Sequence, residues 1–267
     1  MRKLLLSIFL SVLAFSATAA QLDPLPMDQC KVQAPFGFPV SGKQSATDIC
    51  RKGYVLESDN NAKIPVWVSY VLTPAHATGC LSRSNRFAAD HSLQDPATPK
   101  DYAKSGFDIG HQANDSDMRW DVQVELDSFI LSNMAPQLPG FNRGIWKRLE
   151  DQIREWAVER EHDLTIYVGP VYNRTQDSTL KNLGKVTIPH AFYKIVVDDT
   201  THEAMVYLFR HEPSDEDLST FITSIDEVQR QTGVTFPLPA DVKFTGFWDA
   251  EHNTDRATKG KVCALPH

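Results

Sequence analysis

Apolar residues along this chain follow two different spacings. One helix is predicted from about 143 to 161, because apolar residues recur there at the spacing of one helical face. These residues are Ile145, Leu149, Ile153 and Trp156. Five shorter runs in which apolar residues dominate predict strands, and they cover 53–56, 64–72, 164–172, 186–197 and 203–210.

A second helix is predicted over 214–231. Ser214 is suited to cap its first turn, and Asp217 follows three residues later. The apolar stripe of this helix consists of Leu218, Phe221, Ile222, Ile225 and Val228. Strands before and after the helices, without a regular alternation of strand and helix, favour one α+β domain. We expect a mixed, mostly antiparallel sheet with packed helices.

Two stretches predict loops. Residues 21–48 are rich in Pro, Gly and Gln and predict an irregular arm. Residues 81–106 are polar and predict a long surface loop, and such loops are usually functional or disordered.

The first twenty residues differ from the rest of the chain. Two basic residues precede an apolar run from Leu4 to Phe15, and Ala17-Thr18-Ala19 supplies a cleavage signature of small residues. These are the three parts of a secretory signal peptide, and the apolar run is too short to span a bilayer. A buried N-terminal helix is the alternative interpretation. We expect residues 1–20 to be removed and 21–267 to form a single domain, secreted or periplasmic and not attached to a membrane.

Export changes how the cysteines are interpreted. Four remain in the mature chain, Cys30, Cys50, Cys80 and Cys263, and their spacings match no zinc-site pattern. An even count in an oxidising compartment predicts two disulfides, with three possible pairings. Of these we favour Cys30–Cys50, which would close an N-terminal loop, together with Cys80–Cys263, which would hold the C-terminus.

Composition narrows the class of protein. The chain has 267 residues, 42% of them hydrophobic, which is ordinary for a globular protein. Its net charge of −7 argues against a protein held on nucleic acid by bulk positive charge, but not against an enzyme that must release an anionic substrate. GxSxG, HExxH, P-loop and GxGxxG motifs do not occur in it, which weakens serine hydrolase, zinc protease and nucleotide-binding interpretations.

Three polar motifs occur in order between residues 106 and 150. The first is Asp108-Ile109-Gly110-His111, the second is Asn-Met-Ala-Pro-Gln at 133–137, and the third is Asn-Arg-Gly-Ile-Trp-Lys-Arg-Leu-Glu at 142–150. Together they resemble the DNA/RNA non-specific endonucleases, the ββα-metal nucleases, whose hallmarks are Asp-Arg-Gly-His, Asn-x-x-Pro-Gln and an Asn-x-x-x-Trp-x-x-x-Glu helix. The resemblance extends over most of the mature chain. It implies a ββα-metal active-site motif and a divalent cation, Mg²⁺ or else Mn²⁺ or another.

Hydrolysis of a phosphodiester needs an activated water and charge neutralisation on the phosphoryl oxygens. His111 can supply a base, because the ordinary pKa of imidazole lies near working pH. The resemblance implies this role, since the matching histidine of the family activates the attacking water. A structural, hydrogen-bonded histidine is the alternative. Asp108 is expected to shape the turn or orient the loop.

Asn142 precedes or begins the predicted helix, so it is either a helix cap or a metal ligand. Its amide oxygen suits Mg²⁺, which prefers oxygen and keeps most of its waters. The resemblance implies that Asn142 binds the metal directly and that Glu150 holds metal-bound water. Eight helical residues leave Glu150 about 80° beyond two turns and ~12 Å farther along the axis, on the same side. The alternative for Glu150 is an exposed pair with Lys147 or Arg154.

Phosphate-contacting charge is expected from arginines. The family places an arginine beside the catalytic histidine, where this chain has Ile109. A second family arginine precedes an aromatic-x-x-Asp element that residues 83–90 resemble, so either Arg86 or Arg83 matches it. Further candidates for a basic rim, each with a merely solvated side chain as the alternative, are Arg119, Arg143 and Arg148. Asn133 either supports the active site or is purely structural, and Gln137 is expected to be structural.

These inferences predict an exported, metal-dependent endonuclease that cuts DNA and RNA with little sequence preference. Affinity through phosphate contacts carries no sequence information, and no base-reading motif occurs in the sequence. Three alternatives remain: a catalytically weakened relative that only binds nucleic acid, motivated by Ile109; a phosphodiesterase or phosphatase acting on small esters; and a toxin secreted with an immunity partner. The oligomeric state is left open.

Overall fold

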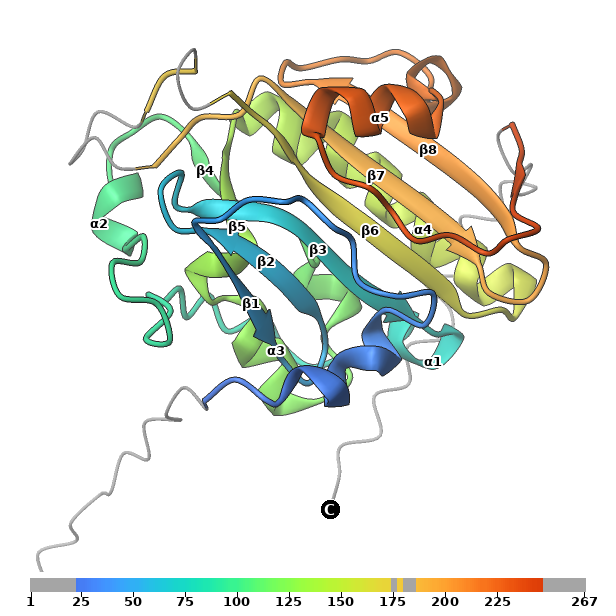
Figure 1. Ribbon diagram of the computed structural model, residues 1–267, viewed down its shortest axis with the longest axis horizontal. Helices are drawn as coiled ribbons and strands as arrows, with labels where there is room; N and C mark the ends of the chain where they lie inside the picture. Colours follow the sequence, from blue (N-terminus) through green and yellow to red (C-terminus); the bar gives the residue numbers. More distant parts are fainter. Residues whose placement is uncertain (1–22, 174–176, 180–185, 247–267) are drawn as a thin grey trace, which may run out of the picture.

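A seven-stranded sheet forms the centre of the computed structural model, which describes residues 23–173, 177–179 and 186–246 (Figure 1). Its strands lie in the order β1-β2-β3-β6-β7-β8-β9, and neighbours are antiparallel except for the parallel pair β8 and β9. The strands are β1 (Ala46–Cys50), β2 (Val55–Asp59), β3 (Ile64–Leu72), β6 (Leu164–Val171), β7 (Ala191–Asp198), β8 (Glu203–Arg210) and β9 (Lys243–Phe244). The expected α+β class, with a mixed and mostly antiparallel sheet, is confirmed.

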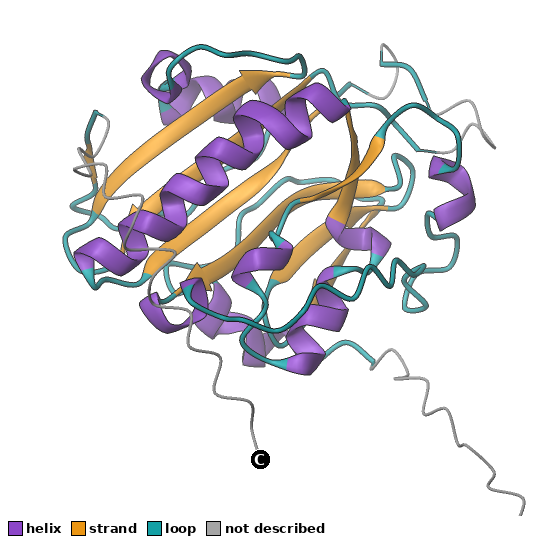
Figure 2. Cartoon of the chain, turned by 180° about the vertical axis from the view of Figure 1, so that it is seen from behind, coloured by secondary structure: helices purple, strands orange, loops and turns teal. Residues whose placement is uncertain are grey.

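Helices cover both faces of this sheet. The α-helices are α1 (Pro74–Ala77), α2 (Pro99–Tyr102), α3 (Val122–Ser128), α4 (Lys147–Arg160) and α5 (Ile225–Thr232). Shorter or irregular helical segments are η1 (Met27–Gln33), η2 (Asp115–Asp117), η3 (Leu131–Asn133), η4 (Phe141–Trp146) and η5 (Leu218–Phe221). Helix α5 lies on the face seen in Figure 1, and the long helix α4 crosses the opposite face, as Figure 2 shows.

Strand β6 shows why both faces are covered. All eight of its residues are buried, so it has no polar, solvent-facing side. Ile166 and Val168 belong to the core on the α4 side, whereas Tyr167 between them belongs to the core on the α5 side. Alternate residues of a strand point to opposite faces, so the continuous apolar run of this strand supplies two cores at once.

A separate two-stranded sheet carries the first two motifs. Strand β4 (Asp108–His111) pairs antiparallel with β5 (Met134–Gln137), which places His111 opposite Met134. The pairing is close at Gly110, where an added Cβ would come within 2.1 Å of the Gln137 side chain, so only glycine fits. Strand β5 leads through η4 into α4, and the two strands and this helix form the expected ββα motif.

Most predicted strands agree with the structure. The predicted bounds 64–72 and 203–210 are those of β3 and β8, and β6 ends one residue before 172. Strand β7 begins at 191 rather than 186. The stretch 21–48, expected to be an irregular arm, contains η1 and the start of β1. Strands precede and follow α4 along the chain, as expected.

The helix predicted at 214–231 is wrong. The structure has the short helix η5 and then α5, which begins after the cap Ser224. Between them Ile222 forms a bridge to Tyr207, and the Thr223 N–H donates to the Val206 carbonyl. The edge of β8 thus uses backbone groups that a continuous helix would have needed, and this pairing interrupts the apolar stripe.

The helix predicted from 143 begins later as a regular α-helix. Residues 141–146 form a π-helical turn, and Gly144 inside it has non-helical angles, φ −102° and ψ −112°. The regular helix α4 therefore starts at Lys147. The predicted apolar face is confirmed, because Ile145, Leu149, Ile153 and Trp156 are all buried.

Two expectations concern the chain ends. Cys30–Cys50 is a disulfide that joins η1 to the end of β1, with 5.7 Å between the Cα atoms. Cys80 is also disulfide-bonded, but its expected partner Cys263 lies outside the described residues, as does the predicted signal peptide at 1–20. In the part of the chain that the structure describes, none of the helices has the length and apolar character to cross a membrane.

Replacing Cys30 and Cys50 together by serine should lower the free energy of unfolding by ~2–4 kcal/mol, because the unfolded chain loses a constraint. Urea unfolding of the variant and the wild type measures this difference. Intact mass after alkylation without reductant should show no reactive thiol in the wild type. An unchanged unfolding midpoint in the double variant would contradict the expected contribution of this bond.

Candidate active site

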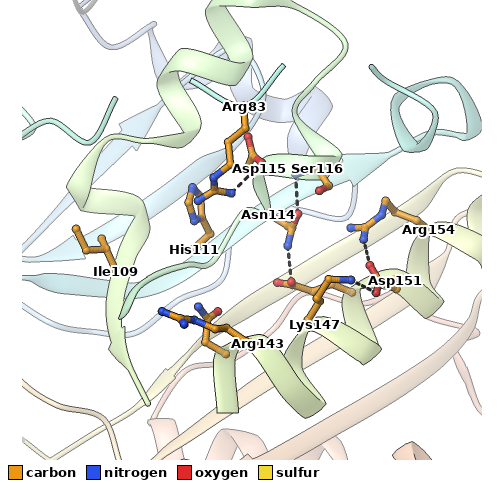
Figure 3. A pocket seen from close by; sticks show the side chains of 12 residues that line it. Arg83, Ile109, His111, Asn114, Asp115, Ser116, Arg143, Lys147, Asp151 and Arg154 are labelled. Atoms are coloured by element: carbon orange, nitrogen blue, oxygen red, sulfur yellow. Dashed lines mark hydrogen bonds and ion pairs between the residues drawn. The ribbon is translucent and has the colours of Figure 1, made fainter. Parts of the chain in front are cut away.

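The ββα motif borders a pocket of about 230 Å³ (Figure 3). One side is formed by Arg83, by β4 and by residues 114–116 in the turn after β4. The other side is formed by the π-helical turn and the first two turns of α4. The pocket is lined by Arg83, Ile109, His111, Asn114, Asp115, Ser116, Asn142, Arg143, Lys147, Glu150, Asp151 and Arg154.

His111 is a buried, neutral imidazole at the end of β4. Its ring packs against Phe87 and Phe129, with ring centroids 5.7 and 4.9 Å away. Among the described residues, no group hydrogen bonds to its buried Nε2 atom. Burial, reinforced by the nearby cation Arg83, lowers the pKa of His111 to about 3, although Asp115 opposes this effect. The imidazole is therefore unprotonated at neutral pH and able to accept a proton.

Arg83 is held next to His111 by a buried carboxylate. Its guanidinium donates to Asp115 at 2.9 Å and lies 4.9 Å from the centre of the Phe129 ring. Arg119 binds the same Asp115 carboxylate, at 3.1 Å from its Nε atom. Only Arg83 of the two arginines lines the pocket, and Figure 3 shows it beside His111.

Asn142 contributes its amide to the pocket from the π-helical turn. Its Nδ2 atom donates to Asp108 at 3.0 Å. Arg143 binds the same carboxylate twice, at 2.8 Å through Nε and 2.6 Å through Nη2. Burial alone would raise the pKa of Asp108, but the bonds from Arg143 and Asn142 outweigh it and the pKa is lowered. The interpretation of Asp108 as a turn-shaping residue is therefore incomplete, because its carboxylate binds two residues of the third motif.

Glu150 is buried, so the exposed pair considered for it is not formed. Its carboxylate accepts from Asn114 and from Lys194, whose Nζ lies 3.4 Å from Oε1. Burial raises the pKa of Glu150, and the ammonium of Lys194 opposes that effect. Lys147 and Arg154 instead pair with Asp151, and Arg154 also binds Asp117.

The structure brings together some predicted site residues and separates others. His111, Asn142, Glu150, Arg83 and Arg143 line one pocket, as does Ile109. Asn133 does not line it, because its buried amide binds the backbone of Ala113 and Ser128 and so fixes the turn after His111. The exposed Arg86 lies outside the pocket lining, and Arg148 donates to the Glu216 carbonyl.

Sequence reasoning missed three groups that organise the pocket. Asn114 and Asp115 lie three and four residues after His111, so their closeness in sequence to the first motif was an available signal. Asn114 bonds to Glu150, and Asp115 holds Arg83. Lys194 lies within a continuous apolar run, and a charged residue inside such a run was the signal for a buried pair.

The chemistry of these residues fits a hard divalent cation held largely by water. Among the described residues, three or more His, Cys, Asp or Glu side chains do not gather into a group that could hold a metal. Mg²⁺ needs only one or two protein oxygens, because it keeps several waters. The amide of Asn142 uses its Nδ2 for Asp108, and its oxygen accepts no hydrogen bond from the residues that the structure describes. Glu150 adds a carboxylate in the same pocket.

Two antiparallel strands followed by a helix, with a neutral histidine and an amide in one pocket, define a ββα-metal nuclease. The chain belongs to the DNA/RNA non-specific endonuclease family, whose model matches residues 33–242. Members of this family are metal-dependent, and the protein is a hydrolytic nuclease that acts on nucleic acid.

Named relatives and a solved structure agree with this assignment. A nuclease of Serratia marcescens is 29% identical over 248 residues, covering 88% of this chain and 90% of the relative. Human mitochondrial endonuclease G is 30% identical over 202 residues, covering 70% and 68%. A chain from the crystal structure of the EndoG/EndoGI complex is 27% identical, with a TM-score of 0.67 over 78% of this chain and 91% of that chain.

The lowered pKa of His111 predicts an unusual pH dependence. Since kcat/KM reports the free enzyme, the term from His111 should stay flat from pH 8 down to about pH 5. A histidine with the ordinary pKa would have lost about tenfold of its active form by pH 5.5. The measurement is kcat/KM on a short oligonucleotide across this range. An inflection near pH 6.5 that disappears in a His111 variant would contradict the lowered pKa of His111.

The same shift affects stability. Below about pH 6.5 the unfolded chain takes up a proton at His111 that the folded protein does not bind until about pH 3. The free energy of unfolding should therefore fall by up to about 1.4 kcal/mol for each pH unit as the pH is lowered from about 6.5 to about 3. His111→Gln should unfold with a weaker dependence on acid pH. Urea unfolding at pH 7 and pH 5 compares the two proteins.

Proposed function

We propose that the protein is an exported, Mg²⁺-dependent endonuclease that hydrolyses phosphodiester bonds in DNA and RNA without strong sequence specificity. The single observation that supports this best is one pocket that contains the neutral His111, the amide of Asn142 and four cationic side chains. In this proposal residues 21–267 form one nuclease domain after removal of residues 1–20. The Cys30–Cys50 disulfide supports export to an oxidising compartment, secreted or periplasmic.

In the proposed reaction His111 is the general base. It accepts a proton from water while the water oxygen bonds to phosphorus and the bond from phosphorus to the leaving ester oxygen breaks. Arg83 lowers the pKa of His111, so a phosphate that neutralises Arg83 would raise it again. The imidazole would then be a stronger base when substrate is bound than in the free enzyme.

The other polar residues of the pocket bind and orient. Asn142 is the proposed protein ligand of the cation through its amide oxygen, and Glu150 is proposed to hold ordered water in the pocket. A bound Mg²⁺ would offset the negative charge that develops on the phosphoryl and leaving oxygens. Arg83 and Arg143 are proposed to contact substrate phosphates, which are the same in every DNA or RNA sequence.

His111→Ala and Asn142→Ala should each nearly abolish cleavage while the fold is retained. His111→Ala removes the base, which corresponds to a loss of ~10²–10⁴ in rate. Asn142→Ala removes the metal ligand, so added Mg²⁺ should partly restore its activity. Plasmid nicking with Mg²⁺ or with EDTA measures both variants. Near-normal cleavage by His111→Ala, or cleavage of a nitrophenyl phosphodiester but not of duplex DNA, would refute the proposed function.

A weakened relative is the second candidate, and Ile109 is the observation that favours it. Ile109 lines the pocket on the same face of β4 as His111, because the two residues are two positions apart on one strand. An isoleucine cannot stabilise charge on the scissile phosphate, and losing one such donor commonly costs ~10²–10³ in rate. The proposed endonuclease requires that other cations of the pocket compensate for the missing charge at Ile109.

Single-turnover cleavage of DNA at fixed Mg²⁺ and salt separates the two candidates. Compensation predicts little gain from Ile109→Arg and a loss of at least tenfold from Arg83→Ala or Arg143→Ala. Smaller losses are expected for Arg86→Ala and Arg119→Ala, whose side chains do not line the pocket. A large gain from Ile109→Arg, with little effect of every arginine substitution, would establish the slow enzyme instead.

A further inference from the structure

Asp108 joins two segments of the site that lie more than thirty residues apart. It is the first residue of β4, and its carboxylate accepts three hydrogen bonds from consecutive residues of the π-helical turn. One comes from Asn142 Nδ2 and two come from Arg143. The side chain of Asp108 is 16% exposed and that of Arg143 is 72% exposed, so the pair lies at the border between pocket and solvent.

We propose that Asp108 is a positioning residue with two tasks. It fixes Asn142 so that the amide oxygen faces the cation site, and it holds Arg143 at the pocket for a substrate phosphate. The inference rests on the proposed function, because it takes Asn142 as the metal ligand.

The first task follows from the chemistry of the two groups. An amide has a donor end and an acceptor end, whereas an ionised carboxylate only accepts. Asp108 can therefore bind the Nδ2 end of Asn142 and not the oxygen end, so rotation of the amide by 180° would place two oxygens together. This one hydrogen bond decides which end of Asn142 is left for a cation.

The second task follows from the donors of Arg143. A guanidinium has five N–H donors, and Asp108 uses one on Nε and one on Nη2. Three donors remain on an exposed side chain that lines the pocket. Figure 3 shows this guanidinium directed away from α4 toward β4, the strand whose residue 109 is uncharged. Asp108 thereby places a cation where its own neighbour in the strand supplies none.

The test compares metal binding in Asp108→Asn and Asp151→Asn. Both variants remove one negative charge: Asp151 lines the pocket, and Asp108 binds Asn142 and Arg143, which line it. Asp151 pairs with Lys147 and Arg154 and, among the described residues, makes no hydrogen bond with Asn142. Mn²⁺ is the probe, and electron paramagnetic resonance of free Mn²⁺ gives its affinity without substrate. Asp108→Asn should bind Mn²⁺ about 10–100-fold more weakly than the wild type and clearly more weakly than Asp151→Asn.

Arg143→Ala separates the two tasks. It should keep the Mn²⁺ affinity within about threefold, since the bond between Asp108 and Asn142 remains. It should bind DNA more weakly when binding is measured in EDTA. The slope of log affinity against log salt concentration should fall by the amount expected for about one phosphate contact. A variant with lost Mn²⁺ affinity, or with an unchanged salt dependence, would overturn the assignment of these tasks.

Two controls make the outcome decisive. Asn142→Ala should lose Mn²⁺ affinity by the same factor as Asp108→Asn. If Asn142→Ala loses affinity and Asp108→Asn does not, the positioning role is wrong while the proposed function stands. If neither variant loses affinity, both are wrong. Should Asp108→Asn fail to fold by circular dichroism, Asp108→Glu provides the same test, because the added methylene moves the carboxylate away from Asn142.

Discussion

The burial of one face of helix α4 against the central sheet is the contact on which the site depends. Leu149, Ile153 and Trp156 of α4, and Trp146 directly before it, are each at most 1% exposed. They pack with residues of β6 and β7 in one core. Burial of an apolar side chain of this size contributes ~1.5–3 kcal/mol, so this face of the helix is firmly fixed. Asn142 just before the helix and Glu150 within it are then presented together toward β4. The same packing that stabilises the domain therefore sets the geometry of the chemistry.

Charge in the pocket is arranged in pairs rather than as a basic surface. Each cation that lines it is bound to at least one carboxylate: Arg83 to Asp115, Arg143 to Asp108, Lys147 to Asp151, and Arg154 to Asp117 and Asp151. These carboxylates fix the positions of the cations before substrate arrives, which is the preorganisation that electrostatic catalysis requires. They also reduce the free positive charge, so a phosphate gains less from binding in the ground state. This agrees with the acidic net charge of −7 and favours release of an anionic product.

The parts of the site that the sequence predicted lie within single motifs. His111, Asn142 and Glu150 were predicted from their motifs and from the chemistry of their side chains, and the structure gathers them in one pocket. The sequence could not decide between Arg83 and Arg86, because the choice depends on which side chain reaches Asp115. Likewise the predicted start of the helix at 143 ignored Gly144, and the helix predicted at 214–231 ignored the pairing that the edge of β8 makes with residues 222 and 223. At residues 222 and 223, backbone pairing with a distant strand overrides the local propensity for a helix.

The pair formed by Lys194 and Glu150 has a consequence for folding. The two residues are 44 positions apart, and Lys194 lies in β7, a strand in the interior of the sheet order. Its ammonium also lies 4.5 Å from the centre of the ring of Trp146, the residue directly before α4. Until β7 has joined the sheet, Glu150 has no counter-ion from that strand, and enclosing its carboxylate beside Asp117 would be unfavourable. Closure of the pocket around an ionised Glu150 is thereby coupled to the pairing of β7 with its neighbours, a contact between residues far apart in the sequence.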